Sequence, residues 1–121
     1  MPAHQLRRAG QDTRFLEWVG TLAEERDAAA LIGACVEHGV NALLLDAGSL
    51  SAAFFELRSG LAGAVLQKLQ NYQIRAALVV PDPEAHGERF AELAREARRG
   101  RSFGVFPTRA QAEAWLAAAD P

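Results

Sequence analysis

Three short apolar runs, each followed by a helical pattern, constrain the fold more than any other feature of this sequence. The runs occupy residues 42–46, 74–80 and 103–106, and the first ends on a carboxylate. A run that is apolar at nearly every position is typical of a strand buried on both faces of a parallel sheet, because such a strand has no side facing water. We therefore predict an α/β fold built on a mostly parallel sheet.

Apolar residues at intervals of three and four predict a helix between successive strands and after the last one. The capping-box spacing of Thr21 and Glu24 opens the first helix, and Gly39 fits its left-handed C-cap. In the second helix, an apolar residue recurs every four positions from Leu57 onward. The predicted helices span residues 21–39, 57–72, 82–100 and 108–119.

The N-terminal region adds an antiparallel hairpin to this pattern. Residues 3–8 and 14–19 are candidate strands, and residues 9–12 supply turn formers between them. The element order is therefore β-β-α-β-α-β-α-β-α, in a single sheet of about five strands with right-handed crossovers. No linker or repeat interrupts this order, so we expect one domain over residues 1–121.

Composition disfavours several classes of protein. The net charge is −2 and the isoelectric point is about 5.9, whereas nucleic-acid-binding domains usually carry a basic excess. No apolar run approaches the roughly 20 residues of a membrane span, and no apolar signal-peptide core is found at the N-terminus. A lone cysteine, Cys35, makes a reduced cytoplasm the expected compartment.

A long motif in the middle of the chain resembles a known family. Its residues are Phe54, Phe55, Leu57, Ser59, Gly60, Ala62, Gly63, Leu66, Gln67, Lys68, Asn71 and Tyr72. The motif is flanked by the runs ACVEHG, LLLD and EARRGRSFGVF. Together they make nearly the whole chain similar to an uncharacterised bacterial family, domain of unknown function 4180. Members often carry an acidic residue where this chain has Ala64. The resemblance implies no established activity.

The order of elements also resembles, at the level of the fold, the sulfate-transporter and anti-sigma-factor-antagonist domains. Those domains carry Ser-Gly-Leu at the start of a helix, and that serine can be a kinase target. Ser59, Gly60 and Leu61 stand at the comparable place, after Arg58 rather than an acidic residue. Arg58, Ser59 and Gly60 are therefore a candidate phosphate or partner site. The alternative is that Ser59 and Gly60 only let the helix begin or pack closely.

Polar residues that follow two neighbouring strands form a second candidate site. Asp46, Ser49 and Ser51 follow one strand, and Asp82 and His86 follow the next. Because ligands bind open α/β sheets at the carboxyl ends of their strands, these five side chains are a candidate ligand rim. The alternative is that they only cap helices and form turns.

Gln67, Lys68 and Asn71 form a third group, near the end of the second predicted helix. Lys68 is the only lysine beside 12 arginines, so its ammonium is either specifically required or simply supports the helix end. A basic cluster, Arg95 with residues 98, 99 and 101, is either a solvated helix end or a contact for an acidic partner or nucleic acid.

We expect no metal and no cofactor. The three histidines fall in different predicted elements, and the glycines lack the spacing of a phosphate-binding loop. Cys35 lies on an apolar helix stripe and is expected to be a buried hydrophobe.

The favoured function is a non-enzymatic regulatory or protein-interaction module. The alternative is a small-ligand-binding protein or an enzyme with its site at the carboxyl ends of the parallel strands. Sequential right-handed crossovers would place several helices on one face of the sheet. The other face then needs cover, either from a second copy in a homodimer or from helices divided between the faces.

Overall fold

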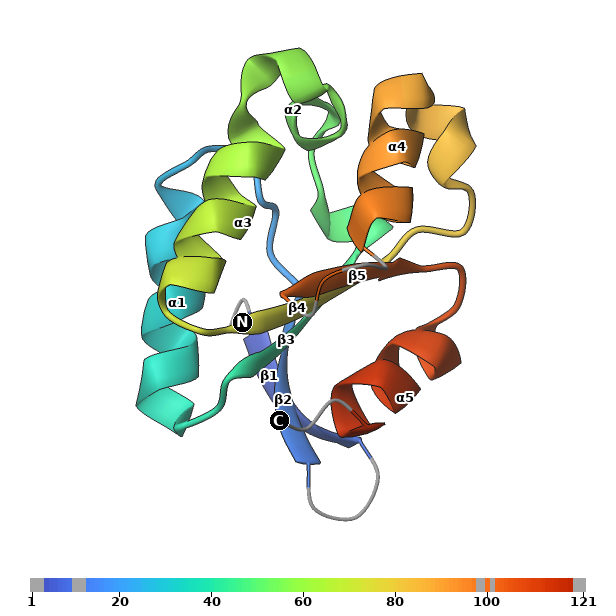
Figure 1. Cartoon of the computed structure of the whole chain (residues 1–121). Helices are drawn as coiled ribbons and strands as arrows, with labels where there is room; N and C mark the ends of the chain where they lie inside the picture. Colours follow the sequence, from blue (N-terminus) through green and yellow to red (C-terminus); the bar gives the residue numbers. More distant parts are fainter. Residues whose placement is uncertain (1–3, 10–12, 98–99, 101, 119–121) are drawn as a thin grey trace.

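The computed structural model describes residues 4–9, 13–97, 100 and 102–118, and its strands form one five-stranded sheet (Figure 1). The strands lie side by side in chain order, with β1 antiparallel to β2 and every later pair parallel. This confirms the predicted α/β fold. The middle of the predicted turn, residues 10–12, lies outside the described residues. The strands are β1 His4–Ala9, β2 Thr13–Trp18, β3 Ala42–Asp46, β4 Arg75–Val79 and β5 Phe103–Phe106.

Helices connect the parallel strands and follow the last of them. The α-helices are α1 Asp27–His38, α2 Ala52–Phe55, α3 Leu61–Asn71, α4 Glu88–Ala97 and α5 Arg109–Ala118. Three short 3-10 helices join them: η1 Ala47–Ser49, η2 Leu57–Ser59 and η3 Pro83–His86. Within the described part of the chain, no helix is long and apolar enough to cross a membrane.

The sheet is apolar on both faces and each face has its own core. Leu43 and Leu45 face α1, α3 and α4, whereas Leu44 and Phe15 face α5 (Figure 1). This division follows from the alternation of side chains along a strand, which turns a continuous apolar run into two buried surfaces. Residues Ala112 and Leu116 of α5 cover the second face, so the helices are divided between the faces. The homodimer stays a prediction.

The first helix begins six residues later than predicted. Leu22 is held by the loop after β3: its amide donates to the Ser49 carbonyl at 2.7 Å, and its carbonyl accepts from the Ser51 amide at 3.2 Å. Asp27 then accepts hydrogen bonds from the amides of Ala23 and Glu24, both at 2.9 Å. The predicted capping box was therefore wrong, because these contacts hold the segment in a turn. The predicted C-cap at Gly39 is confirmed by its φ of 65°.

The second predicted helix, residues 57–72, is divided into η2 and α3, and a separate short helix, α2, precedes it. Gly60 precedes α3 with a φ of 77°, a conformation that glycine adopts without steric cost and that ends the preceding turn. The four-residue repeat beginning at Leu57 therefore spans a break. The third predicted helix is divided in the same way, because Gly87, with a φ of 103°, separates η3 from α4.

The predicted helix starts at Asp82 and Thr108 differ in outcome. Pro83 occupies the first turn of η3, and the Asp82 side chain makes no capping hydrogen bond. Thr108 does cap α5, because its hydroxyl oxygen accepts a hydrogen bond from the Gln111 amide at 3.2 Å.

Candidate functional site

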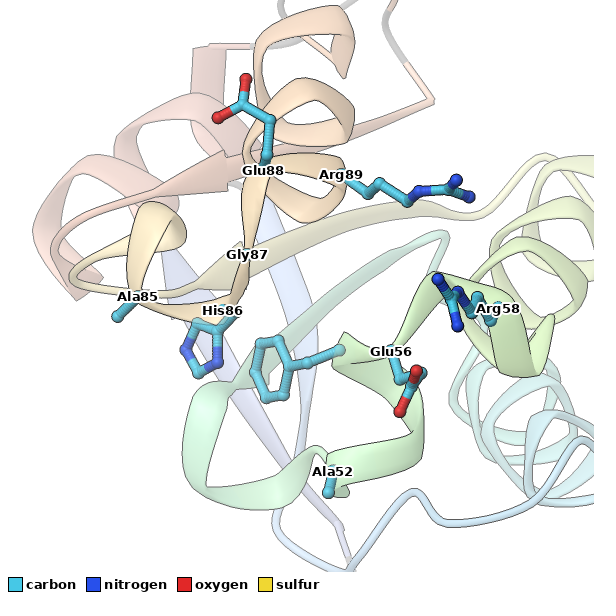
Figure 2. Close-up of a pocket in the computed structure, with 9 residues that line it drawn as sticks. Ala52, Glu56, Arg58, Ala85, His86, Gly87, Glu88 and Arg89 are labelled. Carbon is cyan, nitrogen blue, oxygen red and sulfur yellow. The ribbon is translucent and has the colours of Figure 1, made fainter.

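An open groove of about 670 Å³ lies between the α2–η2 segment and the η3–α4 segment (Figure 2). These two segments follow β3 and β4, so the groove opens at the carboxyl ends of neighbouring parallel strands. This is the edge at which open α/β sheets hold ligands. The residues lining it are Ala52, Phe55, Glu56, Arg58, Ala85, His86, Gly87, Glu88 and Arg89.

Aromatic rings form one end of the groove. The ring of Phe55 from α2 stacks on the imidazole of His86 from η3, with centroids 3.7 Å apart and planes 10° from parallel. Phe90 of α4 is fully buried and presents an edge-on ring to both, at 5.1 Å from Phe55 and 5.8 Å from His86. The rings therefore hold the two walls together while the Phe55–His86 stack faces the groove.

Two arginines, Arg58 and Arg89, stand away from this stack. Figure 2 shows Arg58 of η2 and Arg89 of α4 reaching toward the same end of the groove from opposite walls. Neither guanidinium has a hydrogen-bond or ion-pair partner among the described residues. Glu88, by contrast, pairs with Arg95 at 3.1 Å. The groove therefore combines an aromatic end with a cationic end.

Of the predicted ligand rim, His86 alone lines the groove. The carboxylate of Asp46 accepts from the Gly48 amide at 3.5 Å, which caps η1, and Asp82 is exposed. The Ser51 hydroxyl accepts from the Phe54 amide at 3.3 Å, which caps α2. Capping thus accounts for two of the five residues, and the convergence of all five on one ligand stays a prediction.

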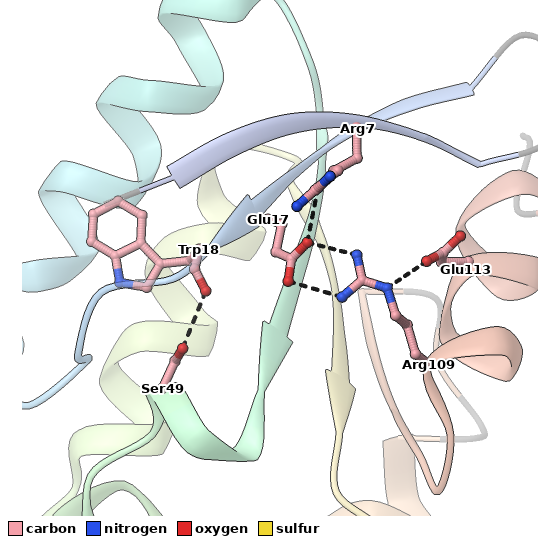
Figure 3. A network of polar contacts seen from close by, with 6 residues as sticks. All are labelled: Arg7, Glu17, Trp18, Ser49, Arg109 and Glu113. Atoms are coloured by element: carbon pink, nitrogen blue, oxygen red, sulfur yellow. Dashed lines mark hydrogen bonds and ion pairs between the residues drawn. The ribbon is translucent and has the colours of Figure 1, made fainter. Parts of the chain in front are cut away.

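Ser49 is a structural residue. Its side chain is buried and its hydroxyl donates to the main-chain carbonyl of Trp18 at 3.2 Å (Figure 3). This hydrogen bond joins the loop after β3 to the end of β2.

The hydroxyl of Ser59 contacts main-chain groups of α2, of Glu56 and of the start of α3. Its oxygen lies 2.5 Å from the Ala53 carbonyl and 2.8 Å from the Glu56 carbonyl, and it accepts from the Leu61 amide at 3.2 Å. These contacts fix η2 between α2 and α3. They support the alternative stated for Ser59 and Gly60, namely that the pair sets the start of the helix, whereas their neighbour Arg58 faces the groove.

The Gln67, Lys68 and Asn71 side chains make contacts within α3 and with the segment before α1. The Gln67 amide donates to the Asn71 side chain at 2.9 Å, one turn away. The Lys68 ammonium lies 3.4 Å from the carboxylate of Glu25, in the segment before α1. None of the three lines the groove.

The basic cluster is described only in part. Arg95 pairs with Glu88 across two turns of α4, and residues 98, 99 and 101 lie outside the described residues. No group of three His, Cys, Asp or Glu side chains within the described ranges is placed to hold a metal ion. Cys35 is buried, and burial raises the pKa of its thiol to about 11, which makes it unreactive.

A buried polar network that the sequence reasoning missed joins β2 to α5 (Figure 3). Glu17 is only 8% exposed, and both of its carboxylate oxygens accept from Arg109, at 2.8 and 2.6 Å. Arg7 donates to the same carboxylate at 3.1 Å, and Arg109 also donates to Glu113 at 2.7 Å. The hydrogen bond from Arg109 is the main reason that the pKa of Glu17 is lowered. The sequence feature that could have indicated this network is the single charged residue Glu17 between the apolar Leu16 and Trp18.

The groove residues Glu56, Glu88 and Arg89 were also missed. Nothing in the sequence around Arg89 distinguishes it from the other arginines, because its role depends on the turn at Gly87 that brings η3 and α4 beside α2.

The family model for the domain of unknown function DUF4180 matches residues 16–116, from within β2 to within α5. The chain belongs to this family. The DUF4180 match encloses both walls of the groove and the Glu17–Arg109 contact. It confirms the resemblance seen in the central motif, whereas the resemblance to anti-sigma-factor-antagonist domains stays a prediction. No curated protein matches the chain, and no solved structure matches it.

Proposed function

We propose that this DUF4180 domain is a non-enzymatic protein-interaction module that receives a partner protein in the groove between α2 and α4. The observation that carries the proposal is a groove with aromatic rings at one end and, at the other, two arginines that have no partner among the described residues. Arginine and aromatic side chains are enriched at protein interfaces and carry much of their binding energy.

The hydrogen bonds of the candidate serines favour a binding role over a catalytic one. A nucleophilic serine needs an adjacent base within hydrogen-bond reach, whereas Ser49, Ser51 and Ser59 all contact main-chain groups. The alternative function, a small-ligand or enzyme site at the carboxyl ends of the strands, would keep His86 in the groove but not the other four rim residues.

Site-specific photo-crosslinking tests this proposal. A benzophenone amino acid replaces Ala85, which is exposed and lines the groove, in cells of the source organism. The matched control replaces Ala29, which is exposed on α1, on the far side of α3 from α4. We expect one protein to be captured at position 85 and not at position 29. Its capture should fall at least about tenfold when Arg89→Glu is added, because a charge-assisted contact is lost.

Three outcomes would contradict the proposal. Equal capture at positions 85 and 29 would mean that the groove is not the contact surface. Capture that Arg89→Glu leaves unchanged would exclude the arginine from the contact. Capture of a second copy of the chain alone would assign the groove to a homodimer.

A further inference from the structure

We infer that the groove binds an acidic peptide segment in which a carboxylate lies close to a flat aromatic side chain. This inference rests on the proposed function and deepens it, because it names the chemistry of the segment that the partner inserts. The cationic end and the aromatic end of the groove each support the inference independently.

The cationic end selects a carboxylate. The chain has 15 acidic residues against 13 basic ones, so it has carboxylates enough to pair its own arginines. It does so at Arg26, Arg95 and Arg109, each of which contacts a glutamate. Arg58 and Arg89 alone, among the arginines whose side chains the structure describes, have neither a carboxylate nor a carbonyl partner.

Two guanidiniums at one end of the groove, neither paired with a carboxylate of the described residues, match an external carboxylate, because the planar fork of arginine fits its two oxygens. The acidic residues of the groove do not fill that role. Glu88 already accepts from Arg95, and Figure 2 shows its carboxylate turned away from Arg58 and Arg89. Glu56 belongs to the same wall as Arg58 and supplies one negative charge against two positive ones. The arginine end therefore keeps a net positive charge, which complements an acidic segment and repels a basic one.

The opposite end selects a flat apolar group. The stacked rings of Phe55 and His86 border open space, because their neighbours Ala52, Ala85 and Gly87 carry almost no side chain. An aromatic side chain of the ligand can continue the stack or meet its edge, both of which are favourable arrangements. A volume of about 670 Å³ falls within the range of ordinary ligand pockets and suits a few residues of extended chain.

Selection from a library of random heptapeptides displayed on phage tests the inference with the full chain as bait. We expect enriched peptides to place Asp or Glu within about three residues of Phe, Tyr or Trp. A synthetic peptide of the enriched sequence should bind the Arg58→Glu/Arg89→Glu variant at least about tenfold more weakly. The control variant Arg14→Glu/Arg26→Glu makes the same charge change at exposed sites outside the groove, and it should retain binding.

Enrichment of peptides without acidic residues, or of none, overturns the inference. So does an acidic peptide that binds the Arg58→Glu/Arg89→Glu variant as tightly as the unchanged chain. If enriched peptides are not acidic yet block crosslinking at position 85, the proposed function stands and only the acidic chemistry is wrong. If crosslinking at position 85 also fails, both are wrong.

Discussion

Phe54→Ala is expected to lower the free energy of unfolding by about 3–5 kcal/mol, the usual cost of removing a large ring from a core. Phe54 is fully buried in the core that α1, α3 and α4 share with the sheet, and it is the buried residue of α2. Its removal leaves a cavity beneath this four-residue helix. A shift in the midpoint of urea unfolding, with the slope unchanged, measures this loss.

The neighbouring substitution Phe55→Ala is the matched control. Phe55 belongs to the same helix but is only partly buried, and its ring faces the groove. We expect a loss of about 1–2 kcal/mol, because less apolar surface is buried there. A loss at position 55 equal to or larger than that at position 54 would contradict the assignment of the two rings to groove and core.

Arg109→Ala is expected to cost about 2–3 kcal/mol near neutral pH. The substitution removes both hydrogen bonds that Arg109 donates to Glu17, and it leaves a nearly buried carboxylate with only Arg7 as a partner. Hydrogen bonds to charged groups contribute about 1.5–3 kcal/mol, whereas an exposed pair contributes about 0–1 kcal/mol. Arg95→Ala, which breaks the exposed pair with Glu88, is the control and should cost less than about 1 kcal/mol.

The cost of Arg109→Ala should depend on pH in a defined direction. Because the pKa of Glu17 in the folded chain lies below its ordinary value of 4.5, its stabilising effect is complete above about pH 5 and declines as the pH falls through the lowered pKa. The difference in unfolding free energy between the two chains should therefore shrink in acid. Urea unfolding at neutral pH and at several pH values below 4.5 measures it, and a difference that grows in acid would be inconsistent with this ion pair.

The parallel strands were predictable because a strand that is buried on both faces of a sheet is apolar at nearly every position. The strands at residues 42–46 and 103–106 could be predicted without knowledge of tertiary contacts. A short, continuous apolar run between helical patterns is typical of a strand in a parallel sheet. The helix starts were less predictable. Thr21 and Glu24 have the spacing of a capping box, but hydrogen bonds of Leu22 to the loop after β3 hold that segment outside the helix. A contact so distant in sequence leaves no local signal.

The sequence predicted where the candidate site lies, but not most of the residues that form it. The carboxyl ends of β3 and β4 were identified, and His86 was named there. Arg89 lies at the start of α4, just after the positive φ of Gly87, and Phe55 belongs to α2, a short helix that the sequence pattern did not predict. The four-residue repeat from Leu57 continues across the break at Gly60, so the sequence pattern did not reveal the turn that places Arg58 in the wall of the groove.

The central claim is that residues 52–59 and 83–89 form the partner-binding surface, and nuclear magnetic resonance tests it most directly. The partner captured at position 85 is added to the ¹⁵N-labelled chain, and backbone amide shifts are recorded residue by residue. We expect the largest changes in those two segments, on both walls of the groove, while α1 and α5 keep their shifts. Changes concentrated on α5 or along β1, with residues 52–59 and 83–89 unaffected, would contradict it.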